Sequence, residues 1–342
     1  MNLPACDRWR RNARLCFPSP LVSHIALVVA TVAALPGSAR AQAGIELSYL
    51  GNAGWQITDG KTVVLVDPYL TRAKMATPND PVREADTRPL VSRDAIAQSD
   101  TATIDTHIRR ADFIVVTHTH ADHVLDVPYI ARKTGALVIG TESTINYARA
   151  SGVPASQLLA VKGGDDLEFG VFSLRVIPSV HGILRRTPNR QLTAGPPPAD
   201  EFPADAKPPF RYRDFVEGGT LAYLIRLGGV QVIVFGSMNY IEREVAGLRP
   251  DVALVGAMTE RREIYHYTAR LMRALGDPPL VLPTHWDAFN VPYGMSQQPA
   301  IDRVQSFVAE VKAASPNSRV IVPGYFRPIR VPARRSRPGG NK

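Results

Sequence analysis

Residues 118–123, with the sequence HTHADH, constrain this chain more than any other feature. They place three of its eight histidines and one aspartate directly after the apolar run at 113–116. An apolar run of that length predicts a buried strand, so the cluster lies where a strand ends and the chain turns. The fold must therefore bring the end of a central strand to a polar site.

The spacing within this cluster suits a metal ion. Side chains two residues apart on an extended segment project to one side, so His118 and His120 can bind one cation together. Asp122 and His123 lie past the bend and can approach the same cavity from another direction. Imidazole and carboxylate together favour Zn²⁺ or a similar first-row divalent ion. The alternative is a solvated polar turn, but such a turn has no need of three imidazoles.

Residues 1–43 have the layout of a secretory signal peptide. Four arginines between positions 8 and 14 precede an apolar stretch at 21–35, and the small residues at 39–43 offer cleavage sites. The apolar stretch is short for a membrane span, although retention as an uncleaved anchor is the alternative. Arg10 and Arg11 permit twin-arginine export, but the flanking residues match that signal poorly. We expect a periplasmic or secreted protein with no stable membrane span after cleavage.

Cleavage near residue 43 changes the composition of the chain. It removes both cysteines, Cys6 and Cys16, so the mature protein has no disulfide and no cysteine ligand for a metal. The net charge falls from +9 to +5, because five arginines and one aspartate lie in the removed segment. A mildly basic protein favours anionic substrates or membrane surfaces. The basic residues are scattered and form no nucleic-acid motif, and the sequence leaves the oligomeric state open.

The hydrophobic pattern predicts one domain over residues 44–330, followed by a disordered basic tail at 331–342. Strands and helices alternate in a mixed order, which is typical of sheets covered by helices in an α+β fold. Residues 71–106 form a long loop with one short helix, and residues 183–216 form either a lid or a disordered insertion. The predicted strands are 45–50, 54–58, 62–66, 113–116, 137–140, a hairpin at 167–178, 220–227, 231–235, 252–255 and 280–282. The predicted helices begin near 125 and span 141–150, 267–275 and 301–314.

Two further histidines repeat the pattern of the opening cluster. His181 and His285 each follow an apolar predicted strand, as His118 does. A lone histidine at a strand end is more often a structural residue, but three such strand ends in one sheet edge would gather five imidazoles and Asp122. We therefore predict that His181 and His285 also bind the metal.

At these positions the chain resembles the metallo-β-lactamase fold superfamily, in its L-ascorbate-6-phosphate-lactonase-like and phospholipase-D-like branch. The matching stretches are 51–55, 66–70, 117–126, 178–182 and 283–286. The resemblance implies a four-layer αβ/βα sandwich with a dinuclear site between the sheets. It implies that one ion is bound by His118, His120 and His181, and the other by Asp122, His123 and His285. One or two Zn²⁺ ions are expected, with iron or manganese as alternatives.

One position departs from that family. After the strand that ends at Phe235, the family normally has Gly-Asp, with the aspartate bridging both ions, but this chain has Gly236 and Ser237. A neutral hydroxyl is a poorer ligand than a carboxylate. The outcomes left open are a weakened second site, a mononuclear site, and a water-bridged pair steadied by Ser237 or Asn239. We expect the weakened dinuclear site, because the other motif positions are intact.

The chemistry that the resemblance implies is hydrolysis of a small phosphodiester, lactone or related ester. A metal-bound hydroxide would attack the substrate, and Asp122 would orient it and accept its proton. Asp67 is a candidate to hold a ligand imidazole, or else a turn residue before Pro68. His266 could protonate the leaving group, or serve only at the start of a helix. The alternative function is a metal-binding protein that lost turnover with the bridging aspartate.

Overall fold

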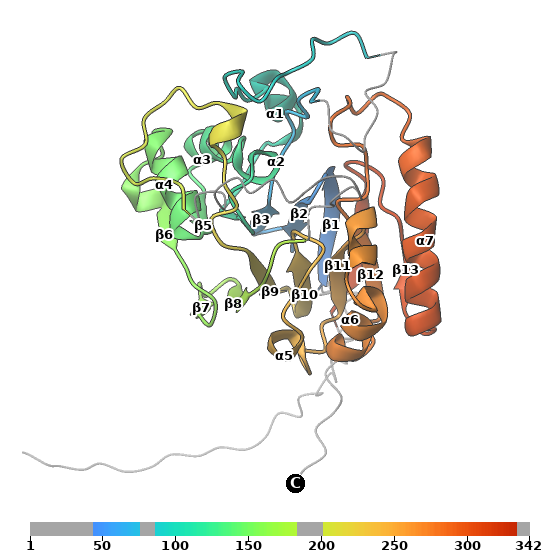
Figure 1. Ribbon diagram of the computed structural model, residues 1–342. Helices are drawn as coiled ribbons and strands as arrows, with labels where there is room; N and C mark the ends of the chain where they lie inside the picture. The colour runs from blue at the N-terminus through green and yellow to red at the C-terminus, as the bar shows by residue number, and fades with distance from the viewer. Residues whose placement is uncertain (1–43, 76–85, 183–200, 334–342) are drawn as a thin grey trace, which may run out of the picture. The chain divides into compact units, whose positions relative to one another are not determined.

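Two facing β-sheets dominate the computed structural model, which describes residues 44–75, 86–182 and 201–333 (Figure 1). The predicted signal peptide, most of the predicted tail and residues 183–200 of the predicted lid lie outside the described residues. Within the described ranges, every helix is too short or too polar to cross a membrane.

The first sheet is antiparallel at one edge and parallel at the other. Asp59 makes the tight turn between its second and third strands, because its carboxylate accepts hydrogen bonds from the main chain of Lys61 and Thr62. Its seven strands lie in the order β14 (Pro328–Pro332), β1 (Gly44–Gly51), β2 (Gly54–Thr58), β3 (Val63–Val66), β4 (Phe113–Val115), β5 (Leu137–Gly140) and β6 (Leu158–Ala160).

The second sheet has the same mixed character. The predicted hairpin turn at Gly228 and Gly229 is present, and both residues have positive φ, as tight hairpin turns require. Its seven strands lie in the order β13 (Arg319–Val320), β12 (Leu280–Thr284), β11 (Val252–Gly256), β10 (Val230–Phe235), β9 (Leu221–Leu227), β8 (Ser173–Pro178) and β7 (Asp166–Glu168).

Helices cover the outer faces of both sheets (Figure 1). On the first sheet lie α1 (Thr101–His107), α2 (Ala121–Val124), α3 (Val127–Thr134) and α4 (Glu142–Ala150). On the second lie α5 (Glu242–Val245), α6 (Tyr267–Leu275) and α7 (Gln298–Ala314). Short 3₁₀ helices are η1 (Ala155–Gln157), η2 (Tyr212–Asp214) and η3 (Thr259–Glu263). The α+β four-layer sandwich expected from the sequence is confirmed.

The alternation of side chains along the strands explains this layering. Val64, Val66 and Val115 belong to the apolar core between the sheets, whereas Leu65 and Ile114 belong to the core beneath the helices of the first sheet. Successive side chains of a strand point to opposite faces, so a strand that is buried on both faces is apolar throughout. The apolar run before the histidine cluster is such a strand.

The carboxyl ends of strands from both sheets meet at one edge of the sandwich. β1, β3, β4 and β5 run in one direction in the first sheet, and β8, β10, β11 and β12 share a direction in the second. Hydrogen bonds join the sheets there: Leu221 N donates to the Thr117 carbonyl at 2.8 Å, and His285 N donates to the Asn52 carbonyl at 2.5 Å. Residues that follow these strands are therefore brought close together.

Several boundaries differ from the sequence predictions by one to four residues, and three of them are informative. Helix α2 begins at Ala121, before the predicted start near 125, because His120 is extended and the chain turns directly after it. Helix α7 begins at Gln298 rather than 301, since Pro299 is well suited to a first helical turn. Strand β14 continues to Pro332, so residues 331 and 332 belong to the first sheet and not to the predicted tail.

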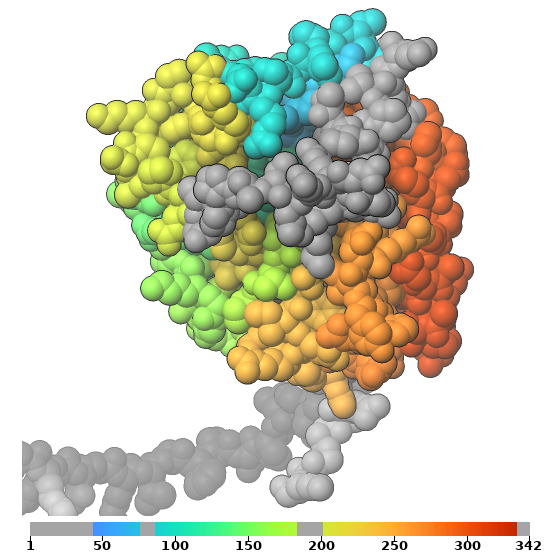
Figure 2. Space-filling view, in the orientation of Figure 1, coloured from blue at the N-terminus to red at the C-terminus, as the bar shows by residue number. Residues whose placement is uncertain are grey.

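Residues 201–216 of the predicted lid are packed against the fold. Phe202 and Phe215 contact the ring of Tyr147 in α4, with ring centroids 5.5 and 5.0 Å away. Ala97 N donates to the Phe210 carbonyl at 2.8 Å, which ties this segment to the loop before α1. Figure 2 shows the yellow surface of this segment adjoining the cyan surface of the residues that follow position 86. Residues 201–216 are therefore an ordered part of the fold and not a disordered insertion.

We expect Gly236→Ala to destabilise the protein strongly. A Cβ atom at Gly236 would lie 1.9 Å from Thr117 Oγ1 and 2.7 Å from Asp67 Oδ2, where the two sheets approach. Overpacking of this kind costs about 1–3 kcal/mol. Thermal or denaturant unfolding of the metal-free protein would measure the loss. The control is Gly294→Ala, because a Cβ there meets no atom within 4 Å. Equal stability of the two variants would contradict the close approach.

Candidate metal centre

The six predicted ligands form two groups at the shared edge of the sheets. The ligand atoms of His118, His120 and His181 lie within 4.8 Å of one another. Those of Asp122, His123 and His285 do the same. The first group joins the end of β4 to the end of β8, and the second joins α2 to the end of β12. The structure thus brings together all six residues predicted from the sequence.

Hydrogen bonds orient the rings of the first group. The Thr117 hydroxyl donates to Asp67 Oδ2 at 2.5 Å, so it can accept from His118 Nδ1 at 3.1 Å. His118 Nε2 is then the unprotonated nitrogen, and it faces His120 Nδ1 at 3.1 Å. His181 Nδ1 donates to the Gly182 carbonyl at 2.9 Å, which likewise leaves its Nε2 available. These lone pairs can converge on one ion.

The second group is arranged around the Asp122 carboxylate. Oδ2 of Asp122 lies 3.5 Å from His123 Nε2 and 3.4 Å from His285 Nε2. His123 Nδ1 donates to Asp67 Oδ2 at 2.8 Å, so its other nitrogen points toward Asp122. His285 Nδ1 is buried and has no hydrogen-bond partner among the described residues. One carboxylate oxygen between two imidazole nitrogens is a suitable cradle for a divalent cation.

Asp67 orients one histidine of each group through hydrogen bonds. Its side chain is fully buried, and it accepts hydrogen bonds from the main chain and hydroxyl of Thr117 and from His123. It therefore holds His123 directly and His118 through Thr117. The sequence left open whether Asp67 holds an imidazole or only forms a turn, and these contacts favour the first interpretation. A carboxylate behind a ligand histidine fixes its tautomer and raises its basicity.

Burial and neighbouring charges set the protonation of the ligands. Burial holds the pKa of His118 well below its usual value and lowers that of His120 to about 4, so both rings are neutral donors near pH 7. Burial alone would raise the pKa of Asp122, but the adjacent His123 and His285 hold it well below the usual range. Neutral imidazoles and an ionised carboxylate are the forms that bind Zn²⁺. Burial would lower the pKa of His123, but Asp122 and Asp67 raise it, so this ring must lose a proton to bind a cation. In that form the donor set fits a divalent metal.

Ser237 and Asn239 hold the loop that carries His181. The Ser237 hydroxyl accepts a hydrogen bond from Gly182 N at 2.8 Å, and it is buried. Asn239 Nδ2 donates to the His181 carbonyl at 3.4 Å. Neither residue belongs to the two groups of ligand atoms. Both act on the main chain next to a ligand.

His266 does not join the metal ligands. It is exposed, it has a left-handed φ of 45° before α6, and its ring packs on Tyr265. It lines a cavity of about 460 Å³ with Arg261 and with Glu310 of α7, and none of the six ligands lines that cavity. The structure gives no support to the predicted role of His266 as a proton donor.

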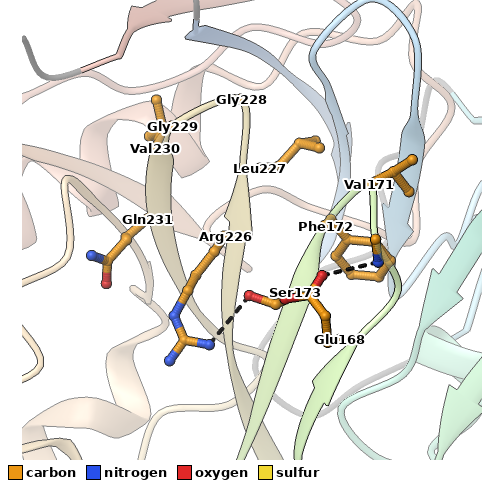
Figure 3. Close-up of a pocket in the computed structure, with 11 residues that line it drawn as sticks. Glu168, Val171, Phe172, Ser173, Arg226, Leu227, Gly228, Gly229, Val230 and Gln231 are labelled. Carbon is orange, nitrogen blue, oxygen red and sulfur yellow. Dashed lines mark hydrogen bonds between the residues drawn. The ribbon is translucent and has the colours of Figure 1, made fainter.

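A second hollow lies away from the ligands, at the turns of the hairpins β7–β8 and β9–β10 (Figure 3). Its volume is about 400 Å³. Its charged lining side chains are already bonded, Glu168 to Gly170 N at 2.9 Å and Arg226 to Asp166 at 2.8 Å. The hollow therefore offers none of the converging unpaired groups of the metal centre.

Sequence reasoning missed Asn52 as a site residue. The stretch around it was noted only as a match to the family, yet Asn52 Nδ2 donates to the carbonyl and to Oδ2 of Asp122 at 2.6 and 3.2 Å. The available signal was an asparagine in the short turn between the first two predicted strands. In the structure this residue has a φ of 55°. Asparagine tolerates that conformation better than most residues.

Comparison with known proteins agrees with this geometry. The family model described as "Beta-lactamase superfamily domain" matches residues 46–285. UPF0173 metal-dependent hydrolases of Heliobacterium modesticaldum and Symbiobacterium thermophilum are 30% and 31% identical over 138 and 139 residues. These matches cover 40% and 41% of this chain, and 46% and 49% of the relatives. The chain thus spans about half the length of the curated relatives it matches.

Solved structures share the fold. Igni18, a novel metallo hydrolase from the hyperthermophilic archaeon Ignicoccus hospitalis KIN4/I, matches with a TM-score of 0.50 and 16% identity. Isothiocyanate hydrolase from Delia radicum gut bacteria matches with a TM-score of 0.50 and 15% identity. The matches cover 84% of this chain in both cases, and 98% and 99% of the two other chains.

We expect His120→Ala to remove the ion of the first group, because His118 and His181 alone cannot complete that group of donors. Metal content measured by mass spectrometry after dialysis tests this. His266→Ala is the matched control, since that exposed histidine lies outside both groups, and it should keep the full metal content. Unchanged metal content in His120→Ala would refute the assignment of the site.

Proposed function

Since this chain belongs to the β-lactamase superfamily, whose metallo-β-lactamase fold it shares, we propose that it is a metal-dependent hydrolase of a phosphodiester, a lactone or a related ester. The observation that carries the proposal is the pair of three-residue ligand groups at one sheet edge. The names of the relatives, metal-dependent hydrolases, support the same class of reaction.

We propose Zn²⁺ as the ion, with iron or manganese as alternatives, because the donors are imidazoles and one carboxylate. A bound divalent ion supplies an acidified water and polarises the bond that is cleaved. The neutral rings of His118 and His120 present lone pairs to the ion. Asp122 Oδ2 lies beside both imidazoles of the second group, and its side chain is 25% exposed, so it can reach and orient an attacking water.

The serine at position 237 distinguishes this site from the pattern of the family. Its hydroxyl accepts a hydrogen bond from Gly182 N, and no carboxylate stands at the sequence position where the family has its bridging aspartate. We propose a dinuclear site in which the second ion is bound more weakly than the first. Ser237 is also the observation that favours the alternative function, a metal-binding protein without turnover.

Metal stoichiometry together with turnover distinguishes the enzyme from that alternative. We expect two ions per chain at saturating Zn²⁺, with hydrolysis of a generic phosphodiester or lactone, because both ligand groups are complete. Metal analysis and a panel of chromogenic esters on the same preparation would measure both. One ion per chain and no turnover across the panel would favour the non-catalytic protein.

A change at position 237 is the companion to that measurement. Ser237→Asp should raise the affinity for the second ion, since it restores a carboxylate at the position where the family has its bridging aspartate. Ser237→Asn is the control, because it adds similar volume without the charge. If Ser237→Asp alters neither metal content nor rate, position 237 is not the missing bridge.

We also propose that the protein is exported and acts in the periplasm or outside the cell. The support is the sequence of residues 1–43, with its basic start, short apolar centre and small residues before position 44. Strand β1 begins at Gly44, directly after this segment, so cleavage there would leave the first sheet intact. N-terminal sequencing of protein from a periplasmic extract should find a start near residues 42–44. Full-length protein retained in the cytoplasm would contradict export.

A further inference from the structure

We propose that Asn52 is a positioning residue for the second ligand group, and that it holds Asp122 and His285 in register across the two sheets. The inference rests on the proposed two-ion site. It adds a residue that belongs to neither ligand group and that bonds to residues from both sheets.

The side chain of Asn52 fixes Asp122. Its Nδ2 atom donates to the Asp122 carbonyl at 2.6 Å and to Asp122 Oδ2 at 3.2 Å. Both acceptors are oxygens, so the amide can present only its NH₂ group to them. Asp122 Oδ2 is also the oxygen nearest to His123 and His285. Asn52 therefore bonds to the same carboxylate oxygen that faces both imidazoles of the group.

The main chain of Asn52 fixes the opposite side of the group. Its carbonyl accepts from His285 N at 2.5 Å and from the Thr284 hydroxyl at 3.3 Å. These residues end β12 of the second sheet, whereas Asn52 follows β1 of the first. One residue thus sets the separation between two ligands that are 163 positions apart in sequence, Asp122 and His285.

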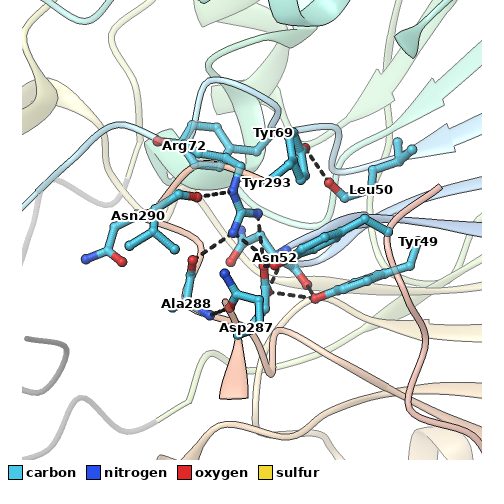
Figure 4. A network of polar contacts seen from close by, with 12 residues as sticks. Tyr49, Leu50, Asn52, Tyr69, Arg72, Asp287, Ala288, Asn290 and Tyr293 are labelled. Atoms are coloured by element: carbon cyan, nitrogen blue, oxygen red, sulfur yellow. Dashed lines mark hydrogen bonds and ion pairs between the residues drawn. The ribbon is translucent and has the colours of Figure 1, made fainter. Parts of the chain in front are cut away.

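A buried ion pair holds Asn52 in place (Figure 4). Asp287 Oδ1 accepts from Asn52 N at 2.9 Å and from the Tyr49 hydroxyl at 2.8 Å. Asp287 Oδ2 lies 2.9 Å from Arg72 Nη1, and both side chains are buried. This ion pair therefore anchors the Asn52 main chain.

The guanidinium of Arg72 has further partners besides Asp287. It donates to the carbonyls of Val291 and Ala288 at 2.6 and 2.7 Å, and it lies over the rings of Tyr293 and Tyr325. A buried charge with this many partners has one favoured position. The Arg72–Asp287 pair that anchors Asn52 is consequently rigid. Asn52 in turn fixes Asp122 through the bond from its Nδ2 and His285 through the bond to its carbonyl.

The backbone conformation makes a clean test available. Asn52 has a φ of 55°, which glycine adopts without strain. Asn52→Gly therefore keeps the main-chain bonds to His285 and Asp287 and removes only the carboxamide that holds Asp122. The control is Asn290→Ala, which removes another buried carboxamide whose NH₂ donates at 3.1 Å to the Met75 carbonyl instead of to a ligand.

The experiment is a Co²⁺ titration of the full chain, followed by the visible absorption of each bound ion. In Asn52→Gly, the second ion should bind about 10–100-fold more weakly, as is typical when a group that orients a ligand is lost. The first ion should bind as in the wild type, and Asn290→Ala should leave both ions unchanged. A general loss of structure would weaken both ions together, so the selective loss is specific to positioning.

Two results would overturn the inference. One is unchanged affinity for the second ion in Asn52→Gly. The other is equal weakening of both ions in that variant. A wild-type chain that binds a single ion would refute the two-ion site of the proposed function and this inference with it, and that result is read before any residue is changed.

Discussion

The metal centre depends on the hydrogen bonds that the carboxylate of Asp67 accepts. This carboxylate lies fully buried where β3 ends, and its two oxygens accept hydrogen bonds from Thr117 and His123. Through these bonds one residue sets the ring orientation of a ligand in each group. A buried carboxylate that lost such partners would be an uncompensated charge, which is strongly unfavourable. The surrounding fold therefore maintains the geometry whether or not a substrate is present.

The same edge concentrates unusual backbone conformations. Asn52, Asp67, Arg72 and His285 all have φ between 39° and 55°, the left-handed region that non-glycine residues seldom adopt. Asn52, Asp67 and His285 directly follow β1, β3 and β12, and Arg72 lies in the loop after β3. All four are held by buried hydrogen bonds or ion pairs. Such conformations persist only where the neighbouring structure stabilises them, and they cluster at functional sites. The interactions that build the metal centre also stabilise these turns.

The ligands could be predicted from the sequence because each lies in a recognisable local pattern. His118, His181 and His285 follow apolar strands, and strand ends of like direction meet at one edge. Asn52, Arg72 and Asp287 could not be found in this way, because their partners lie far along the chain. Asn52 lies 70 positions from Asp122 and 235 from Asp287. His266 is the opposite case. Its position before a helix suggested a functional role, but none of the six metal ligands lines the cavity beside it.

The pairing of β1 with β14 has a consequence for how the protein folds. Gly44 lies opposite Pro332, so the first sheet joins the first strand of the described fold to its last. Until residues 328–332 have paired with it, β1 presents one unpaired edge, which is a site for wrong pairing with other chains. Contacts of such long sequence separation also form slowly. Pairing of β14 with β1 is therefore expected to be a late step in folding, whichever strands pair before it.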